Sequence, residues 1–178
     1  MSNLSCINII ILNIIKPNIA NIIVNRIDRN DSAVLSFNNK YKFNLIYSMN
    51  RDGFEFFYSK CNRQGPFIVL VRVQSKKIYG GYNPIGYANR NVWQSSTESF
   101  VFSFENGKDT HNMKIGRVTN ASYSVLENHK GFFNFGNHLY LNRKNLYLSN
   151  SGNYTNVFNN LNTNLPIEEI EVFTVVKK

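Results

Sequence analysis

Apolar residues recur at helical spacing in the segment that follows Pro17. Four isoleucines fall at positions i, i+3, i+4 and i+8, which places them on one face of a helix: Ile19, Ile22, Ile23 and Ile27. Proline suits the first helical turn, because its missing N–H has no intrahelical partner there. The pattern predicts an amphipathic helix from Pro17 to about Asp28, followed by a polar loop over residues 29–40.

An apolar lead-in, residues 1–16, precedes this helix. Its run INIIILNII covers residues 7–15. The run is not preceded by Lys or Arg, is not followed by a small-residue cleavage site, and is too short to span a bilayer. We therefore expect residues 1–16 to be a buried strand or helix, with a membrane-associating N-terminus as the alternative. Residues 17–178 are expected to form one domain.

The next segment predicts a strand and then a short helix. Residues 41–47 alternate between apolar and more polar positions, which is typical of a half-buried strand. Asp52 can then cap a helix start, and Glu55 can bond back to it as in a capping box. Apolar residues follow at i, i+3, i+4 and i+7: Phe54, Phe57, Tyr58 and Cys61. This spacing predicts that Cys61 lies on the core face of the helix.

Short strands dominate the rest of the chain. FIVLVRV at residues 67–73 is a continuous β-branched run, typical of a strand buried on both faces, and residues 77–82 return as its hairpin partner. Further strands are expected at residues 100–104, 114–118, 122–126, 139–141, 146–148 and 169–176. Many antiparallel strands with two short helices predict an α+β, mostly β domain built around packed sheets.

The glycine pair Gly80-Gly81, in IYGGYNP at residues 78–84, raises the question of a phosphate loop. Such a loop needs glycines at a strand-to-helix turn and usually a Lys-Ser/Thr pair. Here the pair ends a hairpin strand and runs into Tyr82. We interpret it as a bulge or a close backbone approach between sheets, where only glycine lacks a clashing Cβ.

The net charge and the cysteine content indicate which partners and which cellular compartment are favoured. The net charge of +9 attracts anionic partners, but the basic residues are dispersed, so a solvated basic surface is favoured over a dedicated nucleic-acid arm. Cys6 and Cys61 are far apart and form no CxxC motif. This pattern fits a reducing compartment, and we expect a cytoplasmic protein.

No catalytic, metal or cofactor constellation is predicted. His111, His129 and His138 do not share a metal-ligand spacing, and no Ser or Cys lies in a nucleophile elbow. KGFFNF at residues 130–135 begins like the aromatic strand of an RNA-recognition module, but its fourth and fifth positions break that pattern. Packed core aromatics are therefore favoured over stacking platforms for bases.

Two groups of residues remain as candidates for chemistry. The densest acidic group lies near the end of the chain: Glu168, Glu169 and Glu171. A carboxylate pair can do acid–base work if burial splits the pKa values, although a solvated strand face is the favoured interpretation. Cys61 lies at a helix C-terminus, which disfavours a thiolate, so an inert core thiol is expected unless Lys60 or Arg63 offsets that effect.

Short motifs run through most of the chain in one order: RDGF at 51–54, Cys61, Gly65-Pro66, the strand 67–73, IYGGYNP, Trp93, SFVFSF at 99–104, NFG at 134–136 and EEIEVF at 168–173. In this order they resemble a TLDc domain standing alone. The resemblance implies a sandwich of two antiparallel β-sheets flanked by short helices. It also implies structural roles for the motif residues Asp52, Gly53, Gly80, Gly81, Tyr82, Phe100, Phe102 and Gly136.

The resemblance also carries functional expectations. TLDc proteins protect cells against oxidative stress, several bind the vacuolar proton-pumping ATPase, and no enzymatic activity is firmly established for the fold. Cys61 matches a cysteine suspected of a redox role, and Glu169 and Glu171 match acidic positions of the closing strand.

Three positions depart from the family pattern. Asn50 stands where many members have Ser, Asn62 where Asp is common, and His138 where Asp often precedes the late strand. Each change removes a hydroxyl or a carboxylate. The resemblance therefore does not carry over a mechanism that depends on those groups.

Three hypotheses follow. The leading one is a non-catalytic interaction domain that acts in oxidative-stress protection by binding a large assembly such as the vacuolar ATPase. The alternative is direct thiol chemistry or an unrecognised enzymatic activity centred on Cys61. Binding of nucleic acid through dispersed Lys and Arg ranks last.

Overall fold

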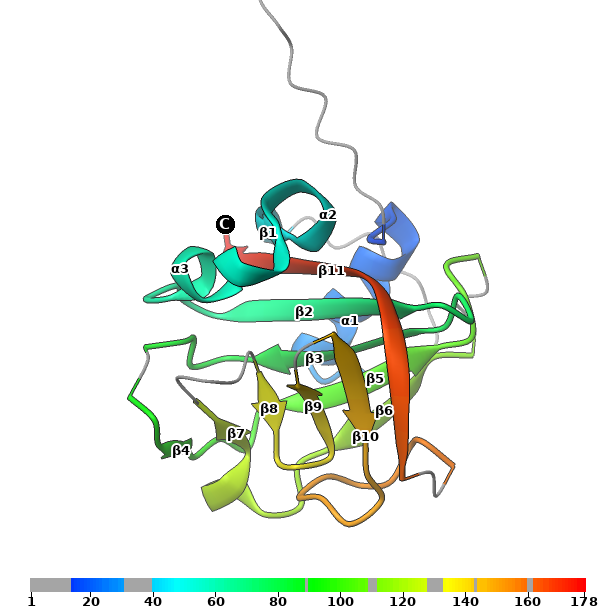
Figure 1. Cartoon of the computed structure of the whole chain (residues 1–178). Coiled ribbons are helices and arrows are strands. Elements are labelled where there is room, and N and C mark those ends of the chain that lie inside the picture. The colour runs from blue at the N-terminus through cyan, green and yellow to red at the C-terminus, as the bar shows by residue number, and fades with distance from the viewer. Residues whose placement is uncertain are drawn as a thin grey trace, which may run out of the picture.

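The protein is mostly β, and one antiparallel hydrogen-bonded sheet folds over on itself to form two layers (Figure 1). The computed structural model describes residues 14–30, 40–88, 90–108, 112–127, 133–142, 144–159 and 162–178. Most of the lead-in, residues 1–13, lies outside this set, so the prediction of a buried segment is tested only at its end. There, Ile14 and Ile15 are buried.

The first layer contains the central strands of the fold. In spatial order its strands are β1 (Tyr41–Ser48), β11 (Thr163–Lys177), β2 (Phe67–Val73), β3 (Ile78–Asn83), β5 (Phe100–Phe104) and β6 (Lys114–Arg117). The second layer contains β4 (Trp93–Gln94), β7 (Val125–Leu126), β8 (Asn134–Phe135), β9 (Leu139–Asn142) and β10 (Asn145–Leu148). The two-layer antiparallel sandwich expected from the sequence is confirmed.

Strand β11 joins the two layers. Its start, Thr163–Pro166, pairs with β10, and its continuation from Ile167 to Thr174 pairs with β2. The register shifts between Ile167 and Glu169, where the strand passes from one layer to the other. In Figure 1 this long red strand turns from the second layer into the first. The sandwich is therefore one continuous sheet rather than two separate ones.

Two apolar cores lie on opposite faces of the first layer. Val69, Val71 and Val73 of β2 face the inner core, between the layers, whereas Ile68 and Leu70 face the outer core. The outer core is completed by helix α1 (Pro17–Ile27), which lies behind the first layer in Figure 1. Burial on both faces explains why β2 is a continuous apolar run, as predicted.

Helix α1 ends at Ile27, as its apolar periodicity predicted, but the capping-box prediction for Asp52 is wrong. Asp52 is the last residue of α2 (Met49–Asp52), and Gly53 follows it at φ 88°, a conformation that favours glycine. The chain then continues through a 3₁₀ turn, η1 (Phe54–Phe56), into α3 (Phe57–Cys61). The local break at Gly53 prevents one helix from starting at Asp52.

The strand predicted at residues 122–126 is shorter than expected. A 3₁₀ turn, η2, occupies Ala121–Tyr123, and β7 contains only Val125–Leu126. The Ser124 amide bonds back to the Ala121 carbonyl, and the Ser124 hydroxyl donates to the Gln94 carbonyl. These local bonds compete with the strand ladder, as Ser commonly does.

The glycine pair lies inside β3, in regular register with both β2 and β5. This position excludes the strand-to-helix turn of a phosphate loop. A Cβ on Gly81 would lie 2.6 Å from the ring of Phe135 in the second layer, and one on Gly80 would lie 2.4 Å from the ring of Phe102. The close approach between layers is confirmed, and the bulge alternative is wrong.

Candidate functional site

The two candidate acidic residues lie side by side on the outer face of β11. Glu169 and Glu171 are both 0% exposed, so the interpretation as a solvated strand face is wrong. The shift in β11 explains the orientation of Glu169: Ile167 and Ile170, three residues apart, both pack on the inner core. Strict alternation would have placed Glu169 on the same face as Ile167.

Glu169, which lies on β11, caps the N-terminus of the short helix α2. Its Oε1 accepts hydrogen bonds from the amide of Asn50, at 3.2 Å, and from its own neighbour Ile170, at 2.9 Å. Ser48, the N-cap residue, provides no side-chain cap of its own. The other oxygen, Oε2, is buried and finds no hydrogen-bond partner in the described part of the chain. The carboxylate therefore satisfies a helix N-terminus, where negative charge is favoured.

Glu171 binds the segment that leads into α1. Its Oε2 accepts hydrogen bonds from the amides of Ile14 and Ile15, both at 3.1 Å. These amides precede the helix, and their own side chains are buried in the outer core. One carboxylate thus pairs two buried main-chain donors that would otherwise be costly to desolvate.

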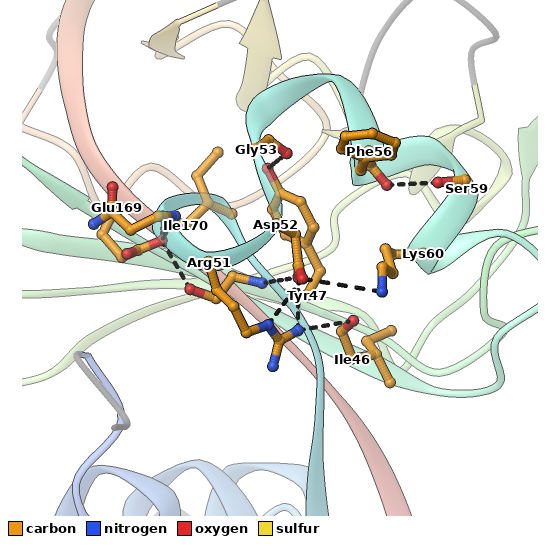
Figure 2. Close-up of polar contacts among 12 residues, drawn as sticks. Ile46, Tyr47, Arg51, Asp52, Gly53, Phe56, Ser59, Lys60, Glu169 and Ile170 are labelled. Atoms are coloured by element: carbon orange, nitrogen blue, oxygen red, sulfur yellow. Dashed lines mark hydrogen bonds and ion pairs between the residues drawn. The ribbon is translucent and has the colours of Figure 1, made fainter. Parts of the chain in front are cut away.

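Asp52 lies on the other side of α2, at the centre of Figure 2. Its carboxylate accepts from the Ser48 amide at 3.0 Å and from two guanidinium nitrogens of Arg51, at 2.9 and 2.6 Å. The Lys60 ammonium lies 3.9 Å away. The hydrogen bond from Arg51 holds the pKa of Asp52 below its ordinary value. Asp52 therefore closes the α2 turn as a paired carboxylate.

Cys61 ends α3 and points into the inner core, as predicted. Its exposed fraction is 1%, and burial, reinforced by the charge of Asp52, raises the pKa of the thiol to about 12. Lys60 lies next to Asp52, so its positive charge is already engaged. A thiol with this pKa is protonated at neutral pH, and the thiolate is the reactive form. The surroundings of Cys61 favour a packing role.

Sequence reasoning missed another buried carboxylate, Glu127. It accepts hydrogen bonds from the amides of Ala88 and Arg90, at 2.8 and 2.7 Å, and from the side-chain amide of Gln94. The carboxylate is fully buried and holds the segment before β4 against the end of β7. A single Glu after two apolar residues carries no sequence signal for such a role.

His138 is also fully buried, among aromatic rings. Its ring stacks on Phe158, with centroids 5.0 Å apart, and lies near Tyr154. Neither ring nitrogen has a hydrogen-bond partner among the described residues. Burial lowers the pKa of His138 to about 4, so the ring is neutral at physiological pH. His138 acts as a flat core side chain, and an Asp at this position would bury a charge beside two rings.

The other candidates separate in space or fall outside the described residues. Phe133 and Phe135 pack in the inner core, which confirms the interpretation of that motif as packed aromatics. His111 and His129 are not among the described residues. Within those that are, no three His, Cys, Asp or Glu side chains come together as a metal site. No described helix has the length and apolarity needed to cross a membrane.

The site thus brings Asp52 and Glu169 to opposite sides of one four-residue helix and uses Glu171 to bind the entry to α1. Comparison with models of protein families gives a match to the TLDc domain over residues 13–176. A search of curated proteins finds no match.

Proposed function

Because the chain belongs to the TLDc domain family, we propose that it is a non-catalytic interaction module that acts in protection against oxidative stress. The family is associated with resistance to oxidative stress. The match covers residues 13–176, nearly the whole chain. The proposed partner is the vacuolar proton-pumping ATPase or a similar large assembly, and the proposed location is the cytoplasm, where a chain with two unclustered cysteines would stay reduced.

One observation carries the non-catalytic part of the proposal. The groups that could do chemistry are used to hold the fold: Glu169 and Glu171 accept hydrogen bonds from main-chain amides, and Cys61 is a buried thiol. A general acid or nucleophile must reach its substrate. Buried groups with main-chain partners support a scaffold more than a reaction centre.

The charge of the protein supports binding to an acidic partner. A net charge of +9 raises the rate of encounter with a negative surface, and this rate falls as salt screens the attraction. Association with the partner is therefore expected to slow with increasing ionic strength. A rate that does not depend on salt would contradict this part of the proposal.

The proposal is tested by affinity capture from a lysate that contains the vacuolar ATPase. The baits are the wild type and Cys61→Ala, with an unrelated protein of similar net charge as the control. Recovery of ATPase subunits by both baits, and not by the control, is the expected result. Alanine is chosen because it removes the thiol without burying a new hydroxyl. Failure of both folded baits to recover the ATPase would contradict the proposed partner.

The competing hypothesis of thiol chemistry has its own test. Reaction of Cys61 with hydrogen peroxide is followed by mass spectrometry in folded protein and in protein unfolded with denaturant. Because burial holds the thiol protonated, we expect protection in the folded state. Faster oxidation in the folded protein than in the unfolded chain would instead support an activated cysteine.

A further inference from the structure

A basic groove lies beside the entry to α1, at the end of the first layer that is farther from the chain's C-terminus. It is open to solvent, has a volume of about 710 Å³, and lies between the start of α1, the end of β2 with the β2–β3 turn, and the segment after β5. Four cationic side chains from these segments line it: Lys16, Arg72, Lys76 and Lys108. These residues are far apart in sequence, so only the fold brings them together.

The groove keeps an excess of positive charge after its ion pairs are counted. Glu168 pairs with both Arg72, at 3.1 Å, and Lys76, at 2.6 Å. Four cations against this carboxylate, and against the buried Glu171 that accepts from the Ile14 amide, leave a net charge of +2 at the groove. Asp109 follows Lys108 and is outside the described residues, but counting it would still leave the groove positive. The fold therefore brings together four basic residues that are dispersed in the sequence.

The accessible apolar surface of the groove comes from its basic side chains. Lys16, Lys76 and Lys108 are exposed, and the aliphatic stems of such side chains present apolar surface while their ammonium groups remain in water. Ile14 and Ile78 also line the groove, but they are only 1% exposed and contribute little surface to a ligand. The groove thus offers aliphatic surface between positive charges. A ligand that matches it needs several negative charges and an apolar group between them.

We propose that this basic groove docks an acidic segment of a protein partner in which carboxylates flank an apolar side chain. The inference rests on the proposed function, because it names the surface through which the interaction module holds its partner. Charge complementarity requires a negatively charged partner, and the aliphatic surface of the lysine stems favours a peptide with an apolar side chain over a simple anion.

Two other anionic ligands fit the groove less well. A single phosphate is usually held by converging main-chain amides, as at a phosphate loop, whereas the cations of this groove are side chains from separate segments. Single-stranded nucleic acid is held by aromatic side chains on which bases stack. Among the described residues that line the groove, none is aromatic. Both ligands serve as alternatives in the test.

The test measures binding of a fluorescent synthetic peptide made of Asp and Glu around one central leucine. The groove variant is Lys16→Glu/Lys76→Glu/Lys108→Glu. The control, Lys42→Glu/Lys177→Glu/Lys178→Glu, changes three exposed lysines near the other end of β11. Each triple change removes six units of charge, so both variants have the same net charge of +3. Only the position of the change differs.

The groove variant is expected to bind the peptide at least about tenfold more weakly than wild type, and the control less than about threefold more weakly. Replacing the central leucine of the peptide by serine is expected to weaken binding to wild type as well. Since Lys76 pairs with Glu168, a milder variant, Lys16→Gln/Lys108→Gln, leaves that pair intact and is expected to show the same direction of change. Circular dichroism and thermal unfolding establish that each variant is folded.

Several results would contradict the proposal that the groove docks an acidic peptide. Equal weakening by both triple variants would assign binding to net charge alone, and absence of peptide binding to wild type would remove the peptide as a ligand class. Groove-dependent binding of inorganic phosphate, of vesicles with anionic lipid or of an oligonucleotide, without binding of the peptide, would assign the groove to that other anion.

Affinity capture with the groove variant separates this inference from the proposed function. Recovery of the ATPase by the groove variant as well as by wild type would refute the groove as the binding surface and would still support the ATPase as the partner. Groove-dependent peptide binding without recovery of the ATPase by wild type would refute the ATPase as the partner and would still support the groove as a site for acidic peptides.

Discussion

Two regions that meet on β11 use neighbouring glutamates in opposite ways. At the basic groove, Glu168 is partly exposed and pairs with two cations. One and three residues later, Glu169 and Glu171 are fully buried and accept hydrogen bonds from main-chain amides. An acidic run in a sequence therefore does not define one site, because a strand presents its residues to different surroundings.

The largest effect is expected at Glu171. Glu171→Ala leaves the buried amides of Ile14 and Ile15 without their acceptor, and should lower the free energy of unfolding by about 2–4 kcal/mol. Glu171→Gln keeps an acceptor oxygen and should cost much less. Chemical denaturation measures both. Equal losses for Ala and Gln would show that charge, rather than hydrogen bonding to the amides, is what Glu171 contributes.

His138 extends the comparison to a buried ionisable group without a hydrogen-bond partner among the described residues. Its pKa is about 4 in the folded protein, below the ordinary value of 6.5, so folding favours the neutral ring. The titration of His138 leaves the free energy of unfolding unchanged above pH 6.5. As the pH falls from 6.5 toward 4, it lowers that free energy by about 3 kcal/mol at most, because the unfolded chain binds the proton first.

The measurement is the free energy of unfolding across this pH range for wild type and His138→Leu. Leucine does not titrate, so the difference between the two proteins isolates the histidine. We expect the stability of wild type to fall more steeply with acidification than that of the variant. Parallel curves would show that His138 does not titrate differently in the folded and unfolded states.

A smaller loss is expected at Glu169, which caps a helix of only four residues. Glu169→Ala removes the acceptor of the Asn50 amide and should cost about 1–2 kcal/mol of unfolding free energy. Hydrogen exchange at the Asn50 amide should accelerate locally. Unchanged exchange at Asn50 would indicate that water or a neighbouring group replaces the carboxylate.

The smallest effect is expected at Glu168. Its partners lie near the surface, so Glu168→Ala should change the unfolding free energy by less than about 1 kcal/mol, and added salt should reduce the difference. Removing this carboxylate should also make the basic groove more positive and strengthen peptide binding there. A stability loss as large as that of Glu171→Ala would break the contrast between the two regions.

Local patterns determined much of the fold from the sequence. The isoleucine spacing predicted α1, the continuous apolar run predicted the doubly buried β2, and the glycine pair predicted the close approach to the second layer. The ordered motifs identified the family. The three structural features depend on residues close together in the chain, or on a side chain that is absent, and are therefore visible in one sequence.

The tertiary structure alone decided the roles of the acidic and basic residues. Alternation along β11 can indicate which residues share a face, but the register shift after Ile167 changes that face, and residues 14–15 that cover Glu171 lie at the other end of the chain. The basic groove likewise assembles from the start of α1, the β2–β3 turn and the segment after β5. The burial and the local charge of a side chain depend on residues that are distant in the sequence, so they could not be predicted from sequence spacing.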